Sequence, residues 1–435
     1  MGFGSPANSG LWPHLEDLVP ETAGVTSNGV LTIGDCRVDD LAAEFGTPAY
    51  IFDETGLRRQ ARRYLDGLRR RRPKSEVLFA SKSLPCVAMY ALAAAEGISI
   101  DVAGQGELVM ALAAGVDPAT IYLHGNAKTD AELTLAHQAG VGAVIIDNFD
   151  ELDRIAAIVR GPQTVMVRIN PGISPDTHDS QNTGSVTSKF GFALGRVEDA
   201  VRKIEGHPLL QMAGVHTHIG SQILDTLPFA TSVKAISAFG DFSRYDVGGG
   251  LGVRYTRDQP APSIDDYLDE IVTSASMYLP DDATLMIEPG RSLVARSGVT
   301  LYRVNSVKAD VKTFVAIDGG MADNLDIALT GQAYEACLPL KMTVEPDTVC
   351  DVVGRQCESG DLMVSGATLP DPQPNDLLLM PVTGAYSYTM SNHYNGAVCP
   401  PIVFCKDGDA VLAARRETYD DLLATHEPAF NRSWS

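Results

Sequence analysis

A lysine at the end of an apolar segment is the first candidate for chemistry in this chain. Residues 77–82 read VLFASK, a run that predicts a buried strand with Lys82 at its end. A lysine carried into a cleft loses solvation, so its pKa falls and its amine can form an imine with a carbonyl group. A surface lysine whose ammonium reaches water is the alternative for this residue taken alone.

Two glycine-containing segments could bind a phosphate group. Residues 214–221 read GVHTHIGS and residues 246–252 read DVGGGLG, each after an apolar run. Backbone N–H groups in such turns approach phosphate oxygens closely, and the hydroxyl of Ser221 adds a donor. A tight strand-to-helix turn has the same composition. His218 could be a core histidine or a ring stacked on an aromatic cofactor.

A third motif could bring a carboxylate and a guanidinium group to the same cleft. Residues 285–291 read LMIEPGR, which predicts a strand followed by Glu288 and Arg291. A carboxylate beside a pyridine nitrogen keeps that nitrogen protonated, and the protonated ring accepts electrons from a carbanion. The arginine can hold a phosphate through two parallel hydrogen bonds. A buried Glu–Arg ion pair without chemistry remains the alternative.

Cys357 is the candidate among the thiols. It lies in GRQCESGD at residues 354–361, between charged side chains that could tune its protonation. The chain has seven cysteines at irregular spacing and no CxxC pair, at positions 36, 86, 337, 350, 357, 399 and 405. This pattern argues against a zinc site and a disulfide framework, so we expect no metal and a reducing compartment.

The order and spacing of these motifs resemble those of fold-type III pyridoxal-phosphate decarboxylases, with diaminopimelate decarboxylase the nearest. The resemblance runs from near residue 50 to residue 418. Ten segments carry it: FASK at 79–82, LHGN at 123–126, VRINPG at 167–172, SKFGF at 188–192, HTHIGSQ at 216–222, DVGGG at 246–250, EPGR at 288–291, DGGM at 318–321, CESGD at 357–361 and TGAY at 383–386. The resemblance implies pyridoxal 5'-phosphate as cofactor, an amino acid as substrate and decarboxylation as the reaction.

The resemblance also implies a role for each matching residue. Lys82 would form the imine with the cofactor aldehyde, His218 would stack on its ring, and Glu288 would face the pyridine nitrogen. The phosphate would be held by Ser221, Gly249, Arg291 and Tyr386. Cys357 of a neighbouring subunit would return a proton to Cα after CO2 leaves, and Glu358 would contact the substrate. The active site is therefore expected to be shared within a homodimer.

One departure from the family pattern concerns the far end of the substrate. Diaminopimelate decarboxylases usually read DNPRPALY after the DGGM motif, and the arginine and tyrosine grip the distal carboxylate. Residues 323–330 read DNLDIALT here, so Asp326 and Thr330 replace those two residues. An anion opposite a carboxylate turns attraction into repulsion, on the order of several kcal/mol in a desolvated site.

Two expectations about the substrate follow from this departure. The substrate is meso-diaminopimelate, or it is a related amino acid that lacks the distal carboxylate and carries an amine or a neutral polar group there. Residues expected at the substrate are Arg291, Asp326, Thr330, Glu358 and Tyr386. In the alternative arrangement Asp326 faces solvent, and another arginine, such as Arg296 or Arg303, replaces the missing one.

The charge balance indicates a small-molecule enzyme. The chain has 34 Lys+Arg against 55 Asp+Glu and a net charge of -21, which disfavours nucleic acid and anionic membranes as partners. The basic run RRRRPK at residues 69–74 fits the end of a helix that stops before Pro73. No apolar stretch of about 18 residues and no leader pattern are present, so we expect a cytoplasmic enzyme.

The pattern of apolar segments predicts an α/β fold in two domains. Eight short apolar runs between residues 77 and 287 are separated by helix-length segments, which favours a (β/α)8 TIM-like barrel of the alanine-racemase type over residues 46–298. Residues 299–435 are rich in strand patterns, and residues 1–45 are expected to join that β-rich domain. An alanine-racemase-like enzyme and a non-catalytic cofactor-binding homologue remain the alternative functions.

Overall fold

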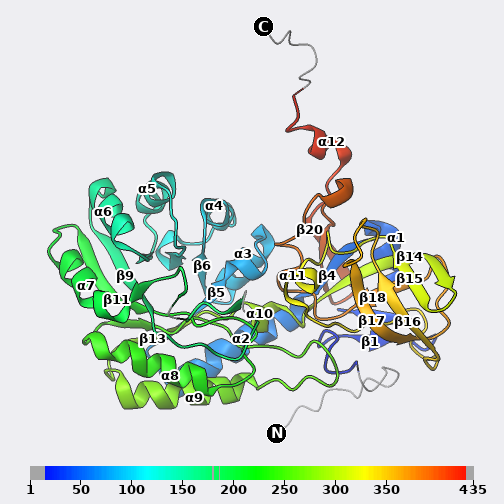
Figure 1. Cartoon of the computed structure of the whole chain (residues 1–435), viewed down its shortest axis with the longest axis horizontal. Coiled ribbons are helices and arrows are strands. Elements are labelled where there is room, and N and C mark those ends of the chain that lie inside the picture. Colours follow the sequence, from blue (N-terminus) through cyan, green and yellow to red (C-terminus); the bar gives the residue numbers. More distant parts are fainter. Residues whose placement is uncertain (1–14, 179–180, 186, 428–435) are drawn as a thin grey trace. The chain divides into compact units, whose positions relative to one another are not determined.

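The computed structural model describes residues 15–178, 181–185 and 187–427 (Figure 1). The chain forms two compact units, one of residues 55–296 and one that combines the described parts of residues 1–54 and 297–435. One sheet forms the barrel unit, and two sheets belong to the other unit.

The unit of residues 55–296 is a closed barrel of parallel strands. Its strands are β5 (Ser75–Ala80), β6 (Ser99–Val102), β7 (Ile121–Leu123), β8 (Ala143–Ile146), β9 (Gln163–Asn170), β11 (Leu210–His216), β12 (Arg244–Asp246) and β13 (Thr284–Ile287). They pair in the order β9-β11-β12-β13-β5-β6-β7-β8, and β8 pairs with β9 to close the ring. Short β10 (Phe192–Ala193) adds to β9. The predicted (β/α)8 barrel is confirmed.

Helices separate these strands along the chain (Figure 1). They are α2 (Glu54–Arg71), α3 (Val87–Ala95), α4 (Gln105–Ala113), α5 (Asp130–Ala139), α6 (Phe149–Ile158), α7 (Val197–Glu205), α8 (Leu227–Ile236), α9 (Ile264–Tyr278) and α10 (Arg291–Val294). Local signals set their ends. Thr129 and Glu132 form a capping box at the start of α5, and α2 ends on Arg69, Arg70 and Arg71, where cations stabilise the carboxyl end of the helix dipole.

Side chains fill the inside of the barrel. Most residues of the strands are buried, as expected when both faces of a parallel sheet are covered. A buried cluster joins residues from five of the strands: Leu78, Tyr122, Ala143, Ile145, Met166 and Met286. The barrel is therefore a packed core, and its strands hold whatever lies at their carboxyl ends in fixed positions.

The second unit is built on strands, as predicted for the β-rich part of the fold. Its main sheet contains β4 (Ala49–Asp53), β14 (Gly298–Ala309), β15 (Thr313–Ile317), β16 (Thr348–Val353), β17 (Leu362–Leu369), β18 (Leu377–Met380), β19 (Ile402–Lys406) and β20 (Asp409–Ala414). Strand β4 lies between β14 and β19 in the order β17-β16-β15-β14-β4-β19-β20, and β18 pairs with β14. A strand from before the barrel is thus part of this sheet.

The remaining elements of this unit are small. A separate sheet contains β1 (Gly24–Val25), β2 (Leu31–Ile33) and β3 (Cys36–Arg37), and the helices are α1 (Val38–Phe45), α11 (Asp326–Thr330) and α12 (Tyr419–Leu423).

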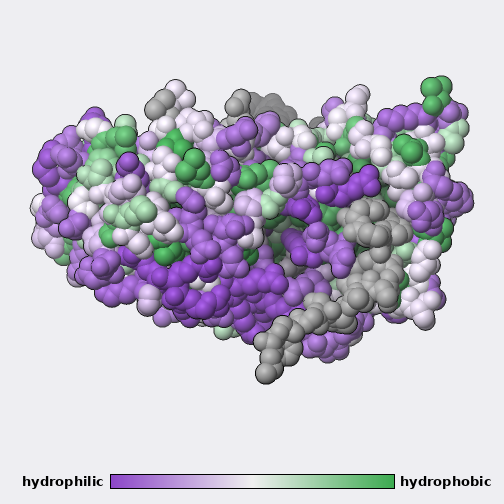
Figure 2. Space-filling view, turned by 90° about the horizontal axis from the view of Figure 1, so that it is seen from below, coloured by the Kyte–Doolittle hydropathy of each residue, from purple (hydrophilic) through white to green (hydrophobic). Residues whose placement is uncertain are grey.

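On the face drawn in Figure 2, hydrophilic residues predominate and hydrophobic ones are scattered among them. Within the described residues, no helix has the length and apolar character that a membrane span requires.

Candidate active site

Four candidate residues that the sequence singled out lie just after four neighbouring barrel strands. Lys82 lies in a 3-10 turn directly after β5, and His218 stands two residues after the end of β11. Gly249 follows β12, and Glu288 directly follows β13. Because β11, β12, β13 and β5 are adjacent and parallel, their carboxyl ends meet at one edge of the barrel. This edge carries the active sites of such barrels.

The glycine run after β12 packs directly on the turn that carries Glu288. A side chain at Gly249 would place its Cβ 2.0 Å from the carbonyl oxygen of Glu288, and one at Gly248, whose φ is +69°, would lie 2.5 Å from the carbonyl oxygen of Thr217. The N–H of Gly249 donates to Nδ1 of His218 at 3.1 Å. These glycines therefore permit a close approach of three loops that no larger residue allows.

Arg291 and Ser221 lie together, as the phosphate-binding prediction requires. Arg291 begins α10, is buried, and donates from Nε to Oγ of Ser221 at 3.2 Å. Its Nη1 also donates to the hydroxyl of the buried Tyr255, whose ring centroid lies 5.7 Å from the guanidinium carbon. Tyr255 was missed by the sequence reasoning. These contacts fix the guanidinium group beside a hydroxyl, a donor set suited to phosphate oxygens.

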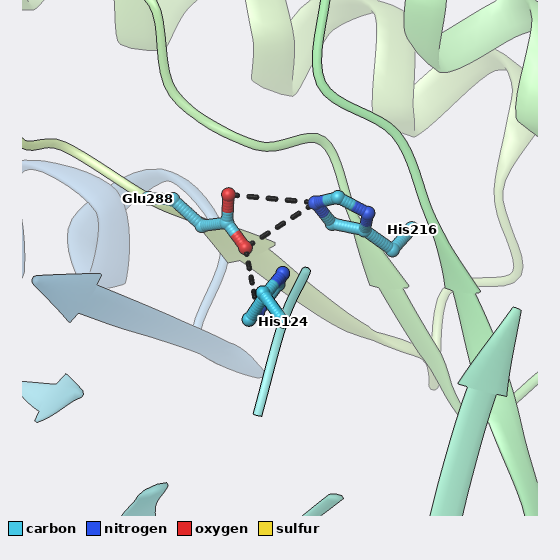
Figure 3. A group of neighbouring side chains, drawn as sticks. All are labelled: His124, His216 and Glu288. Carbon is cyan, nitrogen blue, oxygen red and sulfur yellow. Dashed lines mark hydrogen bonds and ion pairs between the residues drawn. The ribbon is translucent and has the colours of Figure 1, made fainter. Parts of the chain in front are cut away.

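Two histidines from other strands converge on Glu288 (Figure 3). His124 follows β7 and His216 ends β11, and the two rings lie 4.8 Å apart at an angle of 76°. Oε1 of Glu288 lies 3.2 Å from Nε2 of His124 and 3.3 Å from Nε2 of His216. All three side chains are buried. Sequence reasoning gave neither histidine a role, although His124 directly follows a buried strand and this position alone marks it as a candidate.

Burial and neighbouring charges set the protonation states of the side chains in this cluster. Burial lowers the pKa of both His124 and His216, which keeps the rings neutral. Burial and the charge of Glu288 raise the pKa of Asp101 and Asp246 well above the ordinary value. Burial alone would raise the pKa of Glu288 as well, but the surrounding histidines offset it and hold this pKa well below its usual range. Glu288 is thus an ionised carboxylate beside two neutral histidines, and the charge of the buried Arg168 also acts on it.

Several buried polar atoms around Glu288 have no hydrogen-bond partner among the described residues. They are Oδ1 of Asp101, Nδ1 of His216, Oγ1 of Thr217 and Oδ2 of Asp246. Unsatisfied buried polar atoms are costly, and in a cleft they mark where a polar ligand can bind. A protonated ring nitrogen would meet the charge of Glu288, and a phosphate would meet Arg291, Ser221 and the glycine turn. These residues fit a phosphorylated pyridine cofactor.

The same cluster could also hold a metal ion. The ligand atoms of His124, His216 and Glu288 lie within 4.8 Å of one another. A metal-bound histidine usually donates its second ring N–H to an acceptor, which fixes the ring. Nδ1 of His216 is buried without a partner among the described residues, so this support is missing. The arrangement therefore fits the cofactor better than a metal.

The other predicted site residues belong to the β-rich unit. Cys357 and Glu358 are exposed in the described chain, and Tyr386 is half-buried with a left-handed backbone (φ +67°). The N–H of Cys357 donates to Oδ1 of Asn395 at 2.9 Å, and the hydroxyl of Tyr394 donates to Oε1 of Glu358 at 2.5 Å. Neither Tyr394 nor Asn395 was singled out from the sequence.

Asp326 is buried in the first turn of α11 and does not face solvent. The hydroxyl of Thr330 donates to Oδ1 of Asp326 at 3.1 Å and to its carbonyl oxygen at 2.8 Å. The hydroxyl of Tyr334 lies 3.5 Å from Oδ2. Arg303, one of the two arginines considered as a replacement, donates to the carbonyl oxygen of Asn375 at 3.1 Å. The structure therefore brings Asp326 and Thr330 together as a hydrogen-bonded pair.

Comparisons with known proteins show the family to which this chain belongs. Residues 55–295 match the family model of the pyridoxal-dependent decarboxylases, pyridoxal binding domain. The chain is 38% identical to diaminopimelate decarboxylase of Halalkalibacterium halodurans (94% of this chain, 97% of that protein) and 37% identical to that of Bacillus subtilis, with the same shares covered. The crystal structure of diaminopimelate decarboxylase from M. jannaschii in co-complex with L-lysine is 29% identical, with a TM-score of 0.88 over 95% of this chain and 99% of the other. This chain therefore belongs to the pyridoxal-dependent decarboxylases and is a pyridoxal-phosphate-dependent amino-acid carboxy-lyase, similar to diaminopimelate decarboxylase.

Proposed function

We propose that Lys82, at the end of β5, is the residue that holds the cofactor covalently and receives the amino-acid substrate. The observation that carries this proposal is the meeting of Lys82, His218, Gly249 and Glu288 at the ends of four adjacent strands. Only Lys82 among these four offers an amine. A lysine beside this cluster of buried groups is well placed to act as a nucleophile toward an aldehyde.

The other barrel residues hold and polarise the cofactor. When bound, pyridoxal phosphate supplies a protonated ring that accepts the electron pair left by the departing CO2. Glu288, ionised in its buried cluster, keeps the proton on the ring nitrogen. His218 would stack against the ring of the bound cofactor. Ser221, Gly249 and Arg291 bind the phosphate, supported by the contact between Arg291 and Ser221.

Cys357 returns the proton to Cα, and Glu358 contacts the substrate. Both residues are exposed in the single chain, which leaves them accessible to a second copy. We infer a homodimer in which each copy supplies this pair to the other. We also infer a cytoplasmic location, because all seven cysteines are free thiols, as a reducing compartment favours.

The first candidate substrate is meso-diaminopimelate, with L-lysine as the product. The relatives at 37–38% identity are named diaminopimelate decarboxylases and cover nearly the whole chain. Among the solved structures, two of these enzymes were crystallised with L-lysine.

A second candidate is an amino acid with a distal amine or neutral polar group. Asp326 and Thr330 favour it, because a buried carboxylate with a hydroxyl neighbour accepts hydrogen bonds from an amine and repels a carboxylate. Turnover of meso-diaminopimelate, lysine, ornithine, arginine and citrulline, with the amine products identified by mass spectrometry, decides between the two candidates. Efficient turnover of diaminopimelate alone removes the second. Racemised product without CO2 would instead favour a racemase.

The test of the covalent role is the Lys82→Ala variant. We expect it to lose both the yellow absorbance of the bound cofactor and CO2 release. Lys234→Ala, at an exposed lysine of α8, is the matched control and should keep both. Colour and gas evolution retained by Lys82→Ala would overturn the proposal.

A further inference from the structure

The loop that carries Cys357 and Glu358 is fixed at its base by one buried carboxylate. This loop, residues 354–361, is called the Cys357 loop here. Asp361 at its end is buried, and its carboxylate accepts from the N–H of Gln356 at 2.8 Å and from that of Met321 at 2.7 Å. Its carbonyl oxygen accepts from the N–H of Gly354 at 3.0 Å. The two ends of the loop are thus closed on each other.

The tip of the Cys357 loop has no such buried anchor and is held from the side. Asn395 accepts from the backbone N–H of Cys357 through Oδ1, at 2.9 Å. The neighbouring Tyr394 donates its hydroxyl to Oε1 of Glu358, at 2.5 Å. Two successive residues of one short turn therefore contact the two successive residues to which the reaction assigns roles.

The turn that supplies these contacts is itself preformed. Asn395 has φ +54° and ψ +28°, a left-handed conformation that asparagine adopts more readily than other non-glycine residues. The N–H of Gly396 donates to the carbonyl oxygen of His393 at 2.9 Å, and that of Tyr394 donates to Oδ1 of Asn392 at 3.0 Å. The side chains of the turn therefore need little reordering to hold the loop.

We propose that Asn395 and Tyr394 are positioning residues that aim Cys357 and Glu358 separately. The inference rests on the proposed function, in which the thiol protonates Cα and Glu358 contacts the substrate. The bond from Asn395 fixes the backbone from which the Cys357 side chain projects. The bond from Tyr394 holds one oxygen of Glu358 and so orients the other.

The separate roles of Asn395 and Tyr394 predict two different kinetic defects. A displaced thiol impairs proton return, which occurs after the substrate has bound, so loss of the Asn395 contact lowers kcat. A freely rotating Glu358 weakens a contact that substrate makes throughout, so loss of the Tyr394 hydroxyl raises KM. If the turn were purely structural, neither variant would change kcat alone or KM alone.

Steady-state kinetics on the full-length holoenzyme test the proposal. We expect Asn395→Ala to lower kcat about tenfold with KM little changed, and Tyr394→Phe to raise KM about fivefold with kcat little changed. Asn395→Asp keeps an acceptor oxygen and a residue type that tolerates the left-handed backbone, so it should restore most of the lost kcat.

The chain offers matched controls for both changes. Asn375 is also exposed and left-handed (φ +75°), and Tyr419 is an exposed tyrosine in α12. Asn375→Ala and Tyr419→Phe should leave both constants unchanged. Thermal unfolding of every variant establishes that the fold is intact.

The outcomes separate this inference from the function on which it rests. Wild-type kinetics in Asn395→Ala and Tyr394→Phe, with Cys357→Ala inactive, would overturn the positioning roles alone. The positioning roles would also be overturned if both variants changed kcat and KM to the same extent and unfolded at a lower temperature than the wild type. An undiminished kcat in Cys357→Ala would instead remove the proposed role of the thiol.

Discussion

Nε2 of His216 lies 3.4 Å from Oε2 of Glu288, and both side chains are buried at the ends of two strands that are separated by β12. The contact joins a neutral ring to an ionised carboxylate, because burial lowers the pKa of the histidine. The histidine then acts as a donor that supports the charge the cofactor requires.

Replacement of His216 by leucine is expected to weaken cofactor binding. The variant removes a hydrogen-bond donor to a buried charge, a loss of about 1.5–3 kcal/mol, which is about ten- to a hundredfold in affinity. Titration of apo-protein with pyridoxal phosphate, followed by absorbance, measures the change. His216→Gln keeps an N–H donor and should bind more tightly than the leucine variant. Equal affinities in all three proteins would contradict this role.

Gly249→Ala should damage the cofactor site by sterics alone. The new Cβ would meet the carbonyl oxygen of Glu288 at 2.0 Å, so one of the two loops must move, at a cost of about 1–3 kcal/mol. Cofactor titration measures the loss of affinity for the cofactor, and thermal unfolding measures the loss of stability.

The matched glycine is Gly106 in α4, where a Cβ meets no atom within 4 Å. Gly106→Ala should stabilise the protein by about 0.5–1 kcal/mol, the opposite sign. A stabilised Gly249→Ala would show that the two loops are not in close contact.

Lys128→Met is expected to destabilise the barrel strongly. Nζ of Lys128 donates to the carbonyl oxygens of Gly125 and Ile145 at 2.7 and 2.6 Å and to Oε1 of Glu151 at 2.8 Å, and both charged side chains are buried. The variant leaves a buried carboxylate unpaired, at a cost of about 3–5 kcal/mol in the free energy of unfolding. Urea denaturation measures this cost. The double variant Lys128→Met/Glu151→Leu removes both charges and should recover much of the loss, and a double variant as unstable as the single one would refute the explanation.

Asp323 gives the β-rich unit a pH-dependent stability. Burial, with Asp318 and Asp361 nearby, raises the pKa of its carboxyl to about 7, against the opposing hydrogen bond from the N–H of Gly320. Between about 3.8 and about 7 the folded protein binds more protons here than the unfolded chain does. Stability from this group is therefore lost as pH rises through that window, by about 4 kcal/mol in all.

The Asp323→Asn variant tests this contribution by urea unfolding at pH 5 and pH 8. We expect the difference in free energy of unfolding, variant minus wild type, to become more positive at pH 8 because asparagine does not ionise. Asp347→Asn, at an exposed residue whose pKa is lowered by its bond to Thr348, should show no such gain. A difference that stays constant between the two pH values would contradict the raised pKa.

The strands of the barrel could be predicted from the sequence because their signal is local. The runs at residues 77–80, 99–102, 121–123 and 285–287 all lie in observed strands, since a parallel strand buried on both faces must be apolar along its length. The apolar pattern also predicts a strand over residues 215–219, which extends past the observed strand. Strand β11 ends at His216.

The tertiary structure decided which residues and strands become neighbours. His124 and Glu288 meet because strand pairing closes a ring, and β4 lies between β14 and β19 although the whole barrel separates it from both in sequence. Local periodicity records which face of an element is apolar and carries no information on the partner. The charge of Glu288 likewise depends on neighbours from several strands. The amino-acid sequence alone thus determined the elements and the chemistry at their ends, while long-range packing set the distances and the ionisation states.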